Sequence, residues 1–78
     1  MVTQSFEVVQ TFGLDGSSFK IMVKDWDGNR YLVWHFDSIG ISIGDEVLIT
    51  IDNNNWKTIS NPWNGSSSNI TQVNLITH

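Results

Sequence analysis

The fold is decided by residues 19–36, FKIMVKDWDGNRYLVWHF, which predict two β-strands joined by a tight turn. Residues 19–24 alternate apolar and polar side chains, as a strand with one buried face does. Asp27-Gly28 is a strong hairpin signal, because glycine adopts the positive φ that short hairpin turns need. Residues 30–36 are apolar or aromatic on both faces, so we expect one face to be buried and the other to be buried or used for binding.

Four more strands are predicted around this hairpin, at residues 5–12, 45–52, 56–60 and 69–77. Apolar side chains recur at every second position of these segments or nearly so. The expected inward residues are Phe6, Val8 and Phe12 in the first strand, Phe19, Ile21 and Val23 in the second, and Val47, Ile49 and Ile51 in the fourth. In the last strand Ile70 and Ile76 fall on one face, whereas Val73 and Leu75 fall on the other.

The segments between these strands are rich in turn-forming residues. They are GLDGSS at 13–18, three asparagines at 53–55 and NPWNGSSS at 61–68. Residues 37–44, DSIGISIG, contain two glycines and predict a loop rather than a long helix. Six short strands separated by turns predict an all-β domain, a small antiparallel barrel of five to six strands with no long helix.

The length of 78 residues allows one domain, residues 1–78, with a single core. Charged residues make up 15% of the chain, against about 25% in average domains, while hydrophobic residues reach 40%, so the chain is globular rather than disordered. The net charge is −4. This charge argues against binding to double-stranded nucleic acid, which depends on lysine and arginine contacts to phosphates.

The chain has no cysteine, which excludes disulfides and thiolate metal sites. No run approaches the roughly 18 apolar residues of a membrane span, and the first ten residues lack a basic segment followed by an apolar one. We therefore expect a soluble, cytoplasmic protein that does not associate with a membrane.

From Tyr31 to the end, the sequence resembles an SH3-like barrel. YLVWHF matches the first strand of that family, DSIGIS a shortened loop, and IGDEVLITID a Gly-Asp turn with its following strand. NNNWKTIS matches the next hairpin, with Trp56 at its aromatic position, and NITQVNLIT matches the closing segment. An OB-like barrel, counted from Phe6, is the alternative topology.

Only some residues of the polyproline-binding groove found in the signalling members of this family are matched in this sequence. Tyr31 and Trp56 match aromatic residues of that groove, whereas Gln72 stands near its proline and Leu75 replaces its tyrosine. The resemblance therefore does not favour binding of proline-rich peptides. The N-terminal hairpin lies outside the match and must either extend the sheet or cap it.

Two short motifs contain residue types that can bind metal or catalyse reactions, and we expect both motifs to have structural roles instead. Residues 25–29, DWDGN, place oxygen ligands at alternate positions, but the glycine and the glutamate that complete a calcium loop are missing, so a hairpin turn is expected. His35 and Asp37 fall on one strand face, where a carboxylate could orient an imidazole. No nucleophile accompanies them, so we expect a packing role for His35 and predict no catalytic, cofactor or metal site.

Four tryptophans in 78 residues are the most unusual feature of the composition. The candidate interaction surface comprises Trp26, Tyr31, Trp34, Trp56 and Trp63. We expect the loops to fold Trp26 and Trp63 back over an open barrel end, with exposed stacking platforms as the alternative.

These observations favour a small, non-catalytic protein-interaction module that uses an aromatic and aliphatic surface, with a protein partner or self-association. The alternative is a domain that binds carbohydrate or another small ligand by stacking on exposed tryptophans. Binding of single-stranded nucleic acid is a weaker alternative because a basic groove is missing.

Overall fold

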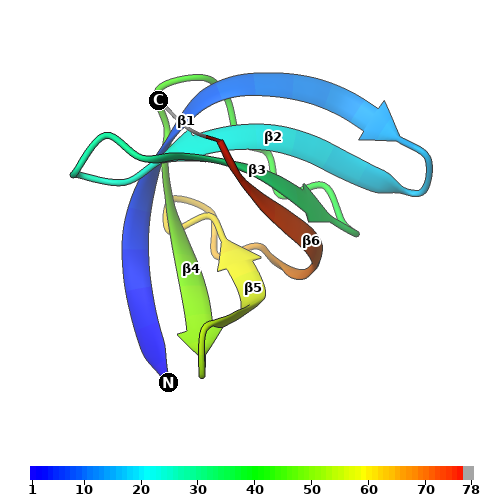
Figure 1. Ribbon diagram of the computed structural model, residues 1–78. Helices are drawn as coiled ribbons and strands as arrows, with labels where there is room; N and C mark the ends of the chain where they lie inside the picture. The colour runs from blue at the N-terminus through cyan, green and yellow to red at the C-terminus, as the bar shows by residue number, and fades with distance from the viewer. Residues whose placement is uncertain (77–78) are drawn as a thin grey trace.

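The computed structural model describes residues 1–76 and contains six β-strands. They are β1 (Val2–Asp15), β2 (Ser18–Lys24), β3 (Arg30–His35), β4 (Glu46–Asp52), β5 (Asn55–Ser60) and β6 (Ser67–Ile76). The strands form one closed antiparallel barrel in the order β1-β2-β3-β6-β5-β4 (Figure 1). The prediction of a small all-β antiparallel barrel is confirmed. None of the described residues forms a helix of the length and apolarity that a bilayer crossing requires.

The barrel joins two three-stranded meanders, β1-β2-β3 and β4-β5-β6. Pairing of β1 with β4 and of β3 with β6 closes the cylinder. Because β4 returns after a connection to lie beside β1, strands β1 to β4 follow a Greek-key path. The N-terminal hairpin β1–β2 lies between β3 and β4, so it extends the sheet and does not cap it.

The core is built from alternate positions of the strands and one residue of the 37–44 loop. Every fully buried apolar side chain in the described residues is aliphatic except one phenylalanine: Phe6, Val8, Ile21, Val23, Val33, Ile39, Val47, Ile49 and Ile59. Two predicted core residues, Phe19 and Ile51, are only half-buried. The two-residue period therefore predicts most of the core correctly.

β1 is longer than predicted and carries two β-bulges. Its register with β2 skips Val9 and Phe12, so each is the extra residue of a bulge. The bulges break the alternation of faces, and the Phe12 ring points outward, 46% exposed, with the Lys20 Nζ 4.8 Å from its centroid. The prediction that Phe12 shares the inward face of Phe6 and Val8 is therefore wrong.

A bulge in β6 corrects a second prediction. The register of β6 with β3 skips Thr71, so the residues on its two sides are out of the usual alternation. Ile70 and Val73 consequently both pack against the core, although an uninterrupted strand would place them on opposite faces. The predicted split between these two residues is wrong for this reason.

Candidate functional site: an open seam between β5 and β6

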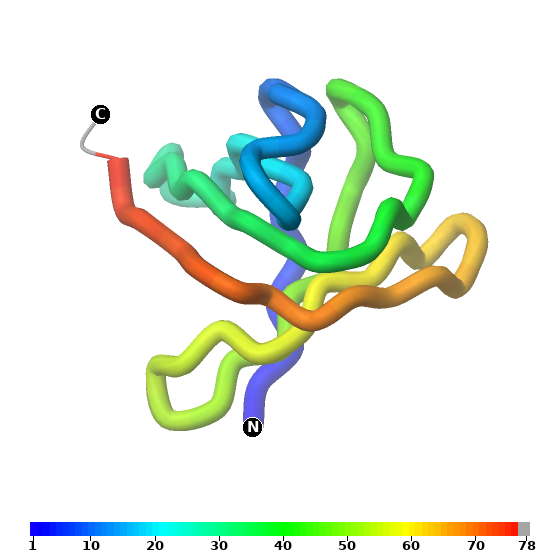
Figure 2. Tube along the Cα trace, turned by 90° about the vertical axis from the view of Figure 1, so that its right-hand side faces the viewer, coloured from blue at the N-terminus to red at the C-terminus, as the bar shows by residue number. Residues whose placement is uncertain are grey.

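Strands β5 and β6 pair with each other over only part of their length. The two strands pair over Thr58–Ser60 and Ser67–Asn69. Beyond this stretch, residues 55–56 pair with β4 alone, and residues 70 and 72–76 pair with β3 alone. Figure 2 shows the C-terminal half of β6 running away from the β4–β5 hairpin. Each strand therefore leaves one backbone edge without a strand partner along this stretch.

Two bulges explain why the strands separate. The register of β5 with β4 skips Lys57, and the register of β6 with β3 skips Thr71. A bulge bends its strand and increases the local twist. Because the bulges lie just beyond the paired Thr58 and Asn69, both strands turn as their mutual pairing ends.

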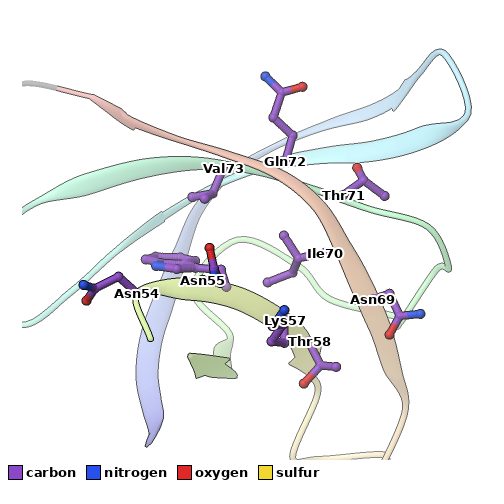
Figure 3. A pocket seen from close by; sticks show the side chains of 10 residues that line it. Asn54, Asn55, Lys57, Thr58, Asn69, Ile70, Thr71, Gln72 and Val73 are labelled. Carbon is purple, nitrogen blue, oxygen red and sulfur yellow. The ribbon is translucent and has the colours of Figure 1, made fainter. Parts of the chain in front are cut away.

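The separated strands enclose a cleft of about 500 Å³. Its lining combines three apolar side chains with amide and hydroxyl groups and one lysine: Trp56, Ile70 and Val73; Asn54, Asn55, Asn69 and Gln72; Thr58 and Thr71; and Lys57. In Figure 3, Ile70 and Val73 point from β6 into the space beside β5, whereas Gln72 points away from it. The cleft thus combines apolar side chains with a polar lining whose one charged residue is Lys57.

The apolar wall of the cleft rests on an aromatic cluster of Phe6, Tyr31 and Trp56. The Trp56 ring centroid lies 5.0 Å from that of Phe6 and 4.8 Å from that of Tyr31. Phe6 and Tyr31 meet edge to face at 5.8 Å. Because Phe6 is fully buried, the half-buried Trp56 packs on a fixed support. Two of the predicted surface residues, Tyr31 and Trp56, are brought together here.

The hairpin turn at 25–29 holds one side of this cluster. The buried Asp25 carboxylate accepts hydrogen bonds from the backbone N–H groups of Asp27 and Asn29, each at 2.9 Å. It also accepts from the Asn29 side chain at 3.2 Å and, more weakly, from the Tyr31 hydroxyl at 3.4 Å. The predicted hairpin turn is confirmed, with Asp25 as its organising residue.

The electrostatics of the turn follow from these contacts. Burial raises the pKa of the Asp25 carboxyl, but the hydrogen bonds from Asn29 and Asp27 outweigh burial and hold the pKa below its usual value. Burial, together with the Asp25 charge, raises the pKa of the Tyr31 hydroxyl. Asp25 is therefore ionised and Tyr31 neutral at pH 7.

Trp34 lies outside the cleft, on the outer surface of the barrel. Its Nε1 donates a 2.8 Å hydrogen bond to the Asp15 carboxylate, and the Lys20 Nζ lies 5.6 Å from its ring centroid. These contacts tie β3 to the end of the β1–β2 hairpin. The third strand therefore buries one face and uses Trp34 on the other to hold its neighbours.

Trp26 and Trp63 are 74% and 80% exposed, so the prediction that their loops fold them back over the barrel is wrong. Trp26 lies in the turn before β3, whereas Trp63 lies in the loop that enters β6 beside the end of β3. The two rings therefore stand at opposite ends of the barrel and do not form a common surface. Neither lines the β5–β6 cleft.

The loop that carries Trp63 is held by asparagines rather than by its ring. The buried Asn61 side chain donates to the Ile39 carbonyl at 2.9 Å and accepts from the Trp63 backbone N–H at 3.0 Å. Asn64 donates to the same Ile39 carbonyl at 3.2 Å. The amide groups thus fasten this loop to the 37–44 loop and leave the indole outside.

His35 is buried, as expected, but its partner is not the one that the sequence indicates. Its Nδ1 lies 2.7 Å from the backbone carbonyl of Asp37, and the Asp37 carboxylate makes no hydrogen bond to the ring. Burial lowers the pKa of His35, against the opposing effects of the Asp37 carbonyl and charge. The imidazole is therefore neutral at pH 7, stacked on Phe19 at 5.7 Å.

The polar rim of the cleft was not predicted from the sequence. Asn54, Asn55, Asn69 and Gln72 belong to turn and strand segments whose composition is typical of turns and edges. The one available signal is a mismatch of length. The predicted last strand, 69–77, is much longer than its neighbour, 56–60, so part of its edge has no partner.

Searches of protein-family models, curated proteins and solved structures found no match to this chain. The resemblance to an SH3-like barrel therefore stays a prediction, and function is argued from the site alone.

Proposed function

We propose that this chain is a non-catalytic protein-interaction domain that receives an extended segment of a partner protein along the free edge of β6. The observation that carries the proposal is the open seam, where residues 70 and 72–76 pair with β3 but not with β5. Addition of a strand to an exposed sheet edge is a recurring mode of peptide recognition, with affinity from main-chain hydrogen bonds and specificity from pockets for alternate side chains.

The free edge of β6 carries no charged residue and no proline to oppose strand pairing, although the bulge at Thr71 is itself a feature found in protected edges. Proteins commonly place lysine, proline or inward-pointing charges on exposed edges to prevent association. Residues 69–76, NITQVNLI, contain neither a charge nor a proline. An edge without charge or proline, beside a cleft that holds apolar side chains, can accept an added strand.

The cleft also defines the chemistry of the partner segment. Ile70 and Val73 point into the cleft, and Trp56 lines it, which favours aliphatic or aromatic side chains on the inward face of the segment. Lys57 is the one charged residue among the described residues that line the cleft. We therefore expect a segment with alternating apolar residues and with an acidic residue at the end that lies close to Lys57.

A peptide-selection experiment tests the proposal. Short peptides selected from a random displayed library on the immobilised protein are synthesised, and their affinities are measured by fluorescence anisotropy. The selected peptide is then N-methylated at one set of alternate residues and, separately, at the other set. Pairing with β6 predicts that one set abolishes binding and the other leaves it nearly unchanged, because only alternate amides of a strand face each neighbour.

Two matched variants locate the peptide. Ile70→Ala shortens a side chain that points into the cleft, and Asn74→Ala shortens an exposed β6 side chain that does not line it. The proposal expects weaker binding to the first and unchanged binding to the second, with thermal melts to verify that both variants remain folded. Equal effects of both N-methylated sets, or equal affinity of both variants, would contradict it.

Carbohydrate binding is the second candidate, and the rim of the cleft favours it. Four amide and two hydroxyl side chains surround the cleft that Trp56 lines, and sugars are bound by such combinations of hydrogen bonding and stacking. Titration with a panel of simple glycans, followed by tryptophan fluorescence, tests this. A response that Gln72→Ala and Ile70→Ala both leave unchanged would place any sugar outside the cleft.

A further inference from the structure

The distribution of charge sets β6 apart from the other strands. Each of the other five carries at least one charged side chain: Glu7 and Asp15 in β1, Lys20 and Lys24 in β2, Arg30 in β3, Glu46 and Asp52 in β4, and Lys57 in β5. β6 carries none, and the net charge of −4 comes entirely from residues 1–57. Two copies of the chain therefore repel each other over most of their surface, but a contact of β6 with β6 brings no like charges together.

The free part of β6 also leaves an apolar side chain uncovered. Beyond the bulge at Thr71, residues 72–76 pair one to one with β3. Val73 packs against the core, and Leu75 lies two positions further along, on the same face of the strand. Leu75 is nevertheless 66% exposed, because β5 pairs with β6 only as far as Asn69. A free backbone edge and an uncovered aliphatic side chain thus occur together.

Residues 72–76, QVNLI, are complementary to an antiparallel second copy of themselves. With Asn74 on a two-fold axis, Val73 of each strand lies opposite Leu75 of the other, which gives two identical aliphatic pairs on one face. On the other face Gln72 lies opposite Ile76, and the two Asn74 amides meet across the axis, where each can donate to the other. A two-fold contact of this kind is closed, so it produces a dimer and not a chain of copies.

We propose that two copies of this chain pair through residues 72–76 of β6, antiparallel and centred on Asn74, when no partner segment occupies the edge. The proposal rests on the same free edge as the proposed peptide recognition and goes beyond it by naming a second copy as a competing occupant. The contact is small, as in weak and transient complexes, so the edge is free in dilute solution and the dimer forms at high protein concentration.

The same charges explain why a partner segment displaces the second copy. β6 has no carboxylate to place near Lys57, so this lysine gains no ion pair in the dimer. A partner segment with an acidic residue at that end gains one. The dimer is therefore the weaker of the two complexes.

The first measurement is the mass of the wild-type protein by sedimentation equilibrium, over a concentration series that reaches about 1 mM. The mass should rise from 8.8 kDa toward twice this value. Hydrogen exchange of the amides on the free edge between Gln72 and Ile76 should slow over the same series, which locates the contact. An excess of a selected peptide should return the protein to the monomer with bound peptide.

Two substitutions at the axis test the register. Asn74 is exposed, so Asn74→Lys and Asn74→Asp remove no packing within the barrel. Like charges then lie directly opposite each other in a dimer, so each variant alone should associate several-fold more weakly than wild type. An equimolar mixture should regain the association, because lysine then faces aspartate across the axis. Only a two-fold contact centred on Asn74 gives this rescue.

A wild-type protein that keeps the monomer mass at about 1 mM would overturn the proposal. So would variants that associate as strongly as wild type, a mixture that associates no better than either variant alone, or a dimer that persists when peptide is bound. The outcomes for dimer and peptide are distinguishable. A monomeric wild type that binds a selected peptide contradicts the dimer alone, whereas a dimer for which no peptide can be selected contradicts peptide recognition alone.

Discussion

Asp25→Asn tests how the β2–β3 turn supports the aromatic cluster beneath the cleft. The substitution keeps an oxygen for the Asp27 and Asn29 backbone N–H groups but removes the charge. In the wild-type protein the Asn29 side-chain nitrogen and the Tyr31 hydroxyl donate to the second carboxylate oxygen of Asp25. The substitution places an amide NH₂ group opposite both of them. The turn therefore loses at least one charge-assisted hydrogen bond and gains two donors that face each other.

The magnitude follows from these contacts. A hydrogen bond to a charged group contributes about 1.5–3 kcal/mol, and solvent around the turn reduces this, so we expect Asp25→Asn to cost about 1–3 kcal/mol. In a domain of this size the melting temperature should fall by roughly 5–20 °C. Because the Asp25 pKa is depressed in the folded state, its contribution is present above about pH 4 and is lost as the pH falls further. The difference from wild type should therefore narrow in acid.

Tyr31 gives a direct reading of the same interaction, because it is the single tyrosine of the chain. Burial and the Asp25 charge raise its pKa above 10.0, so removal of the charge should move the ionisation midpoint down toward that value. The phenolate absorbance, measured against pH with circular dichroism to verify folding, reports the midpoint. Asp27→Asn is the matched control, because the Asp27 charge has the smallest effect on Tyr31. Identical midpoints and melting temperatures in wild type and Asp25→Asn would refute the reasoning.

Three further predictions concern stability. Burial lowers the pKa of His35 in the folded state, so the unfolded chain binds the proton more readily, and the free energy of unfolding should fall below about pH 6.5 by up to about 1.4 kcal/mol per pH unit. Denaturant titrations at two pH values should show that the free energy of unfolding changes less with pH in His35→Gln than in wild type. An equal change in both proteins would argue against burial of the neutral ring. Trp26→Ala and Trp63→Ala should each change stability by less than about 0.5 kcal/mol, since both rings are exposed; a larger loss in a thermal melt would mean that the loops pack them. Gly40→Ala should destabilise by about 1–2 kcal/mol in a denaturant titration, because φ is +70° and the new Cβ would lie 3.1 Å from the Asn64 side-chain nitrogen, whereas a neutral result would show that this loop can shift.

The strands and most of the core could be predicted because the two-residue period is a local property. All six predicted strands exist, and the inward faces of β2 and β4 were largely assigned correctly. The asparagine turn also follows from local chemistry, since Asn53 and Asn54 adopt positive φ, which asparagine tolerates. These features depend on neighbours in the sequence and not on the rest of the barrel.

The bulges could not be predicted, and they account for the errors that affect the site. A bulge depends on the partner strand, which hydrophobic alternation does not encode. The bulge at Phe12 moved this ring to the surface, and the bulge at Thr71 placed Ile70 and Val73 on one face. The bulges at Thr71 and Lys57 together also separate β5 from β6, so the cleft between these strands could not be predicted from the sequence.

The positions of the loop tryptophans were unpredictable for a different reason. The Asn61 and Asn64 side chains hold the loop that carries Trp63 in place through hydrogen bonds, so the Trp63 ring is not needed to pack this loop. Asp25 does the same for the turn that carries Trp26. Composition alone gives no indication that polar side chains hold these loops in place of the aromatic rings.

Amide hydrogen exchange of β6, measured by NMR with and without a selected peptide, tests the central claim most directly. In the free protein, the β6 amides that face the cleft should exchange faster than the amides bonded to β3, because they have no strand partner. Bound peptide should slow exchange at these alternate amides between Ile70 and Ile76. Saturation with peptide that leaves their exchange unchanged would contradict strand addition at β6.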